Sequence, residues 1–108
     1  MSNLTKLFTL FTTIEREYGI ASLEKGERKI LNLIVSAEEQ KKEMSAEELV
    51  DLNIASRATI YRRLSSLKES GLVSINDRSG KSILVTTLKF KSFAQSLNLA
   101  AGMNNEGT

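Results

Sequence analysis

The sequence predicts an α+β fold, mostly α with a β-hairpin, and three observations lead to this prediction. Apolar residues recur at three- and four-residue spacing in five stretches of the chain. A stretch rich in β-branched residues interrupts this pattern once, and a glycine-containing turn divides it in two. The 108 residues include no proline, no repeat and no low-complexity linker. We therefore expect one domain with a modest core.

The first two helices follow from apolar stripes. The spacing predicts a helix over residues 3–18, which Gly19 can end. A second helix is expected over residues 23–40 because apolar residues continue from Leu23 to Val35 at helical spacing. The stripe of the first helix comprises Leu4, Leu7, Phe11, Ile14 and Tyr18.

Two further helices are expected over residues 45–71. Ser45 and Glu48 have the spacing of a capping box, in which the serine hydroxyl accepts a hydrogen bond from the Glu48 amide. Asn53 begins a tight turn, since asparagine tolerates the left-handed conformation. Ser56 then caps a helix that Gly71 ends, with an inner side formed by Ile60, Leu64 and Leu67. Two helices joined by so short a turn form a helix-turn-helix unit.

A β-hairpin is expected over residues 72–88. Its strands are the segments LVSIND and KSILVTTL, and Gly80 in the turn between them can adopt positive φ. A hairpin directly after a helix-turn-helix makes a winged helix. Helical spacing returns over residues 88–101, and we expect residues 102–108 to form a disordered tail. The predicted architecture is a winged helix-turn-helix over residues 1–101, with N- and C-terminal helices that dimerise.

The composition excludes several classes of function. Cysteine and histidine are both absent, which removes disulfides, Cys/His zinc sites and catalysis by a thiol or imidazole. No acidic cluster has a convincing metal-ligand pattern. We therefore expect no catalytic residues, no metal, no cofactor and no enzymatic activity.

The net charge of +2 hides an asymmetry between the two halves of the chain. Residues 1–51 hold seven Lys/Arg and ten Asp/Glu, a net charge of −3. Residues 52–108 hold eight and three, a net charge of +5. This distribution favours a polyanion as the partner of the second half. The N-terminal apolar stretch is interrupted by threonines and too short for a membrane span, so we expect a cytoplasmic protein with no membrane partner.

The outer face of the helix over residues 56–70 is the candidate DNA-binding surface. Arg62 is long enough to reach guanine O6 and N7, and Ala58 is small enough for close approach to a base. Hydroxyls and free amides at the helix start suit phosphate oxygens. The candidate residues on this helix are Ser56, Arg57, Ala58, Thr59, Tyr61, Arg62 and Ser65. Arg63 lies nearer the core, so we expect its stem to pack there while its head reaches out.

The hairpin turn supplies a second candidate site. Arg78 and Lys81 lie in the turn, away from the expected core, so their side chains are free to bind a partner. Such cations can follow the minor groove of DNA. Asp77 is placed to hold the Arg78 guanidinium. A plain solvated turn remains the alternative.

With these residues in view, the chain resembles the MarR family of bacterial winged-helix regulators. EELVDLNIASRATIYRRLSSLKESGLV is similar to the helix-turn-helix of that family, and DRSGKSILVTTL to its wing, over roughly residues 24–100. The resemblance implies that Arg57, Ala58, Tyr61 and Arg62 occupy recognition-helix positions, that Arg78 occupies the wing tip, and that Thr86 or Thr87 caps the last helix. It also implies that a small-molecule effector is possible, although the sequence identifies none.

The terminal helices are the expected dimer interface, because one domain of this size needs only part of their apolar surface for its own core. The candidate residues are Leu4, Leu7, Phe8, Phe11, Ile14, Phe90, Phe93 and Leu97. The alternative is that both helices pack only within one chain. The expected function is that of a homodimeric, sequence-specific repressor that binds double-stranded DNA. Two alternatives stay open, a winged helix used for protein contacts and a DNA-binding protein of replication or partition.

Overall fold

The computed structural model describes the backbone of residues 3–106 and the side chains of residues 3–102. Within that range it confirms an α+β fold with a layout compatible with a winged helix. The contacts divide the chain into two compact units, where the sequence predicts one domain. One unit is residues 24–87, and the other combines the two ends of the chain, up to residue 23 and from residue 88.

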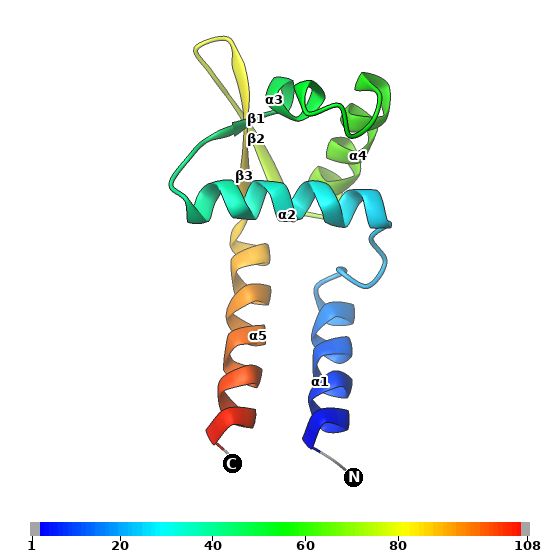
Figure 1. The fold of residues 1–108 in the computed structure, drawn as a ribbon, viewed down its shortest axis with the longest axis vertical. Helices are drawn as coiled ribbons and strands as arrows, with labels where there is room; N and C mark the ends of the chain where they lie inside the picture. The colour runs from blue at the N-terminus through cyan, green and yellow to red at the C-terminus, as the bar shows by residue number, and fades with distance from the viewer. Residues whose placement is uncertain (1–2, 107–108) are drawn as a thin grey trace. The chain divides into compact units, whose positions relative to one another are not determined.

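The unit of residues 24–87 contains three helices and one sheet (Figure 1). The chain runs through α2 (Lys25–Glu39), β1 (Met44–Ser45), α3 (Ala46–Asp51), α4 (Arg57–Glu69), β2 (Val73–Arg78) and β3 (Lys81–Thr86). The strands form an antiparallel sheet in the order β1-β3-β2. The predicted hairpin is therefore confirmed, whereas β1 had no signal in the sequence because it is only two residues long.

Local sequence signals explain where the helices of this unit begin and end. Ser45 Oγ accepts from the Glu48 amide at 3.1 Å, and Ser56 Oγ accepts from the Thr59 amide at 3.2 Å, so both predicted caps are confirmed. Gly71 has a φ of 76° and donates to the Lys68 carbonyl, while the next amide donates to the carbonyl of Leu67. This pair of bonds is a Schellman motif, which ends α4 and starts the chain toward β2.

The hairpin turn is set by Ser79 and Gly80, which both have positive φ values, of 50° and 77°. Two left-handed residues in a two-residue loop match the twist of the flanking strands. Arg78 and Lys81 therefore face each other across the ladder, directly at the tip. The positive φ at Asn53, 56°, likewise confirms the predicted tight turn between α3 and α4.

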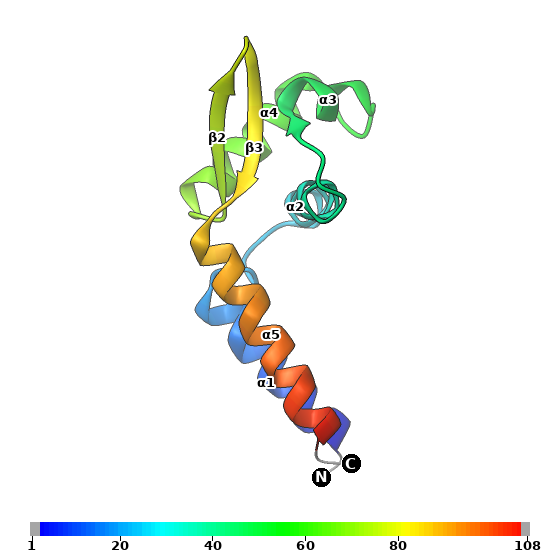
Figure 2. The same cartoon turned by 90° about the vertical axis from the view of Figure 1, so that its left-hand side faces the viewer.

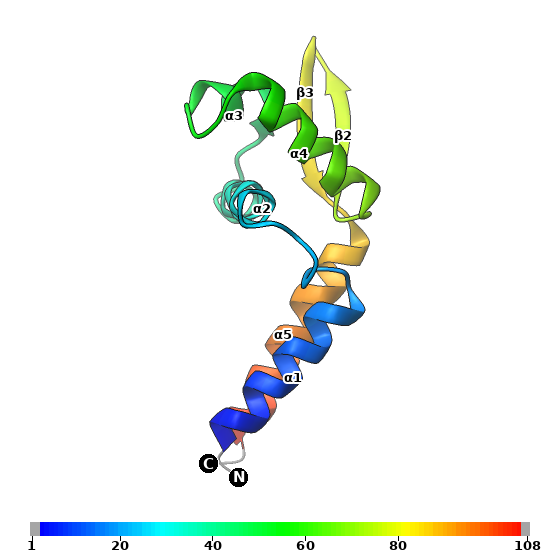
Figure 3. The same ribbon diagram turned by 90° about the vertical axis from the view of Figure 1, so that its right-hand side faces the viewer.

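The core of this unit is aliphatic and lies between α2, α3, α4 and the sheet. The residues with almost no exposed surface include Ile30, Ile34, Leu49, Ile60, Leu64, Leu67, Leu72, Val73 and Leu84. The inner side predicted for α4 is thus confirmed. α3, α4 and the hairpin all lie on one side of α2 (Figures 1, 2 and 3).

The second unit pairs α1 (Asn3–Glu17) with α5 (Leu88–Glu106). The two helices lie side by side and antiparallel (Figures 2 and 3). Ile14 and Phe93 are buried between them, and the Phe93 ring contacts the rings of Tyr18 and Phe90 at centroid distances of 5.8 Å each. Both terminal helices therefore form, as the apolar stripes predict.

α5 continues to Glu106, past residue 101, where the sequence predicts that the helix ends and a disordered tail begins. The segment contains no proline, and one glycine with two asparagines lowers helix propensity by only about 1 kcal/mol per residue or less. A helix that is already formed can therefore extend through Gly102. Residues 107 and 108 of the predicted tail lie outside the described residues.

Candidate nucleic-acid interface

The exposed face of α4 carries the residues that the sequence assigns to it. Arg57, Ala58, Tyr61, Arg62 and Ser65 are all exposed. They lie opposite the aliphatic residues of the same helix, so the fold fixes which side of α4 faces outward. Tyr61 is exposed to 37%, so about a third of its surface is open to a partner.

Two contacts organise the start of this face. The Arg57 guanidinium carbon lies 6.0 Å from the centre of the Tyr61 ring, within the range of a cation–π contact. Ser56 donates to the Thr59 hydroxyl oxygen at 2.9 Å, and Thr59 is only half-buried. The Thr59 hydroxyl keeps its own proton, which can still be donated to an anion.

The wing-tip cations are exposed, but one of them already has a partner. Arg78 Nη1 forms an ion pair with Glu43 Oε1 at 3.6 Å, and both side chains are mostly exposed. The expectation that Asp77 holds Arg78 is wrong, because Asp77 instead accepts a hydrogen bond from Ser82 Oγ at 3.2 Å. Glu43 lies just before β1, the short strand that brings it beside the hairpin and that the sequence did not predict.

A carboxylate on α2 holds the base of the wing. Glu38 Oε2 accepts from the backbone N–H of Thr86 at 3.1 Å, and Glu38 Oε1 accepts from the Thr86 hydroxyl. The Thr86 hydroxyl is therefore bound to α2 and does not cap α5, while Thr87 directly precedes that helix and donates its hydroxyl to the Gly71 carbonyl. Sequence reasoning missed this contact because its partners are 48 residues apart.

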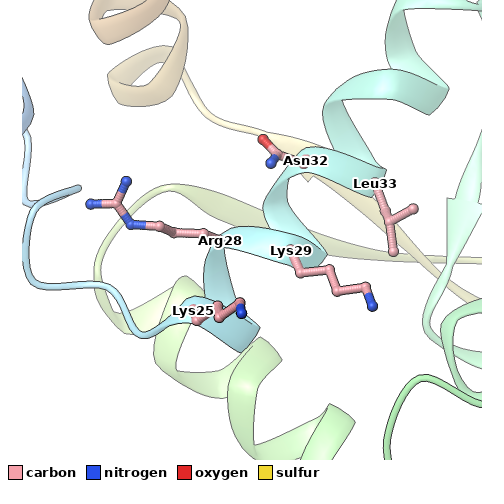
Figure 4. Close-up of a pocket in the computed structure, with 5 residues that line it drawn as sticks. All are labelled: Lys25, Arg28, Lys29, Asn32 and Leu33. Atoms are coloured by element: carbon pink, nitrogen blue, oxygen red, sulfur yellow. The ribbon is translucent and has the colours of Figure 1, made fainter.

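A second group of cations lies on the face of α2 that points away from the core. Lys25, Arg28 and Lys29 line a shallow hollow of about 420 Å³ together with Asn32 and Leu33. Lys25 and Lys29 extend to one side of the helix and Arg28 to the other (Figure 4). The signal in the sequence was the spacing of three cations over one helical turn. α3, in contrast, is acidic, with Glu47, Glu48 and Asp51.

The residues assigned to dimerisation divide into two groups. Ile14 and Phe93 are buried, and Leu7, Phe11, Phe90 and Leu97 are half-buried, so packing between α1 and α5 of one chain accounts for much of this surface. Leu4 and Phe8 are exposed to 60% and 62%. Leu10, which flanks the stripe of α1 together with Phe8 and is expected to pair with it across a two-fold axis, is exposed to 40%. On α5, Leu88 and Leu99 are exposed as well, and neither belongs to the predicted interface.

Among residues 3–106, no helix is both long and apolar enough to cross a membrane. In the same part of the chain, no three His, Cys, Asp or Glu side chains are grouped so that they could hold a metal ion. Known protein families and curated proteins were also compared with the sequence, and no family model and no curated protein matches it.

Proposed function

We propose that the chain is a sequence-specific double-stranded DNA-binding transcriptional regulator of MarR-like type, in which α4 enters the major groove. The observation that carries this proposal is the division of α4. One side is fixed in the core by Ile60, Leu64 and Leu67, and the other offers arginine, hydroxyl and small side chains to solvent. A polyanion with a groove of helix width suits such a surface.

Each exposed residue has a chemical role in this proposal. Arg62 offers two donors to the O6 and N7 of a guanine, and Ala58 permits close approach and contact with a thymine methyl. Tyr61 donates to a phosphate or packs on a sugar, and Arg57 stacked on its ring adds positive charge at the same place. Ser56, Thr59 and the first amides of α4 bind phosphate oxygens, while Ser65 contacts a base or phosphate.

The wing adds contacts to the neighbouring minor groove through Arg78 and Lys81. Because the two residues face each other at the hairpin tip, both cations reach the same stretch of backbone. The negative potential of a narrow groove competes with Glu43 for the Arg78 guanidinium.

We further propose that the protein acts in the cytoplasm as a homodimer, through the terminal helices, and most simply as a repressor that blocks polymerase. Two helices alone bury only one face each, and Leu4, Phe8, Leu10 and Leu99 stay exposed on this pair. A two-fold dimer would present two copies of α4 about 34 Å apart and would select a pseudo-palindromic site. A small-molecule effector is compatible with this proposal.

Fluorescence anisotropy with a labelled random duplex at several salt concentrations tests DNA binding. We expect binding at low salt that weakens steeply as salt rises, because phosphate contacts release counterions. Selection of bound fragments from a random pool should then return a symmetric site. If the protein does not bind the random duplex at low salt, the proposal of DNA binding is wrong.

One observation favours a second candidate, a winged helix that binds proteins. The acidic side chains of α3 and the ion-paired state of Arg78 reduce the positive charge around the helix-turn-helix. The same titration separates the two candidates, since a protein-binding module would not bind random duplex. A role in replication or partition is distinguished from promoter binding by whether the selected sites occur as repeats at an origin.

A further inference from the structure

The side chain of Arg63 joins α4 to the first turn of α2. A methyl group on Gly26 would lie 2.3 Å from Arg63 Cζ and 2.6 Å from both Nε and Nη1. The guanidinium thus occupies the space that a Cβ would fill, which only glycine leaves open. Arg63 is half-buried, and its Nε is inaccessible to solvent, so the inner part of the guanidinium is covered at this place.

The same place holds a buried carboxylate. Glu27 is only 6% exposed, and its Oε1 accepts from the backbone N–H of Glu24 at 3.0 Å in a capping box. Within the described residues, Glu27 Oε2 and Arg63 Nε have no hydrogen-bond partner. Both side chains line a cavity of about 180 Å³ with Glu24, Arg62 and Ser66. A polar cavity of this size admits waters that can connect a donor with an acceptor.

The remaining contact between α2 and α4 is aliphatic. Ile30 and Ile34 on α2 and Ile60 and Leu64 on α4 are completely or almost completely buried. Hydrophobic packing is non-directional, so it allows α4 to rotate slightly about its own axis. A polar side chain held in one position limits that rotation more strictly. Arg62 directly precedes Arg63, and any rotation of α4 therefore changes where Arg62 points.

We propose that Arg63 is a positioning residue, packed on Gly26 and lining the same cavity as Glu27, which fixes the rotation of α4 and thereby the direction of Arg62 toward a base. Arg63 itself does not touch DNA. The inference rests on the proposed function for its consequence at DNA, but the contact between the two helices is measurable without DNA.

The test compares Arg63→Met and Gly26→Ala. The first variant removes the guanidinium, and the second fills the space above Gly26 in which the guanidinium lies. Lys68→Met, which removes an exposed cation from the same helix, is the matched control. Spin labels on cysteines placed at Lys29 and Glu69 report the distance between α2 and α4, since the chain has no cysteine of its own. Anisotropy with a selected duplex and a random duplex reports specific and non-specific affinity.

We expect both variants to broaden or shift the label distance, and the double variant to do no more than either alone. Specific affinity should fall about tenfold, while non-specific affinity and the salt slope stay unchanged. The inference is wrong if neither variant changes the label distance. It is also wrong if Arg63→Met weakens binding to every sequence and reduces the salt slope by about one, because Arg63 would then be a phosphate contact. If the unmodified protein does not bind random duplex, the proposed function fails, and the label distances still decide whether Arg63 holds α4.

Discussion

The contact between Glu38 and Thr86 makes the base of the wing sensitive to a single carboxylate. Glu38→Ala leaves the amide and hydroxyl of Thr86 without their partner, and Thr86 is only 4% exposed. A buried donor left unsatisfied costs about 1–3 kcal/mol. Because Glu38 is half-buried and water can enter in part, we expect the variant to lower the free energy of unfolding by about 2–4 kcal/mol.

Glu38→Gln should cost less, about 1 kcal/mol, because the amide oxygen can accept from the Thr86 N–H and the amide nitrogen can donate to the hydroxyl. The charge of the acceptor is lost, and the bond to the hydroxyl reverses its direction, so the hydroxyl proton must find another acceptor. The matched control is Glu39→Ala, which removes the exposed neighbouring carboxylate. Urea unfolding followed by helical circular dichroism gives the three free energies. Equal midpoints for Glu38→Ala and Glu39→Ala would refute the reasoning, because the contact would then contribute nothing.

Four further changes test the proposed DNA and dimer interfaces. Arg62→Ala should weaken specific binding by about 1–3 kcal/mol and relax preference at one base pair; an unchanged preference in a fragment selection would count against this face of α4. Arg78→Ala should lower affinity for all sequences evenly in anisotropy, and a loss confined to discrimination would contradict the wing assignment. Glu43→Gln should raise affinity by up to about fivefold, because an exposed ion pair contributes at most about 1 kcal/mol, and this gain should vanish in the Arg78→Ala background. Phe8→Glu should shift the protein from dimer to monomer in sedimentation equilibrium, and a dimer of unchanged stability would place the interface elsewhere.

The helix-turn-helix and the wing could be predicted from the sequence because their signals are local. Ser56 caps a helix three residues away, and Ile60, Leu64 and Leu67 repeat within two turns. Positive φ at Asn53, Gly71 and Gly80 is expected because asparagine and glycine tolerate it and these residues stand at turns and at a helix end. The exposed side of α4 then follows from its buried side.

The contacts that position the site could not be predicted, because they join residues that are distant in sequence. Nothing near Arg63 indicates that its head will lie on Gly26, and nothing near Arg78 indicates Glu43. An apolar stripe indicates that one face of a helix is buried, but it does not indicate whether another helix of the same chain or a partner chain buries it. The stripes on the terminal helices were therefore assigned to a partner, whereas much of that surface packs between α1 and α5.

The pairing of α1 with α5 has a consequence for synthesis. α1 is synthesised before residues 18–87, and α5, the helix that covers it, is synthesised after them. Residues 24–87 form a compact unit by themselves, so this part of the chain can fold before α5 is synthesised. The apolar side of α1 stays exposed during that time. This side is therefore exposed for as long as residues 18–87 take to be synthesised, which makes it the part of the nascent chain most open to contact with another apolar surface.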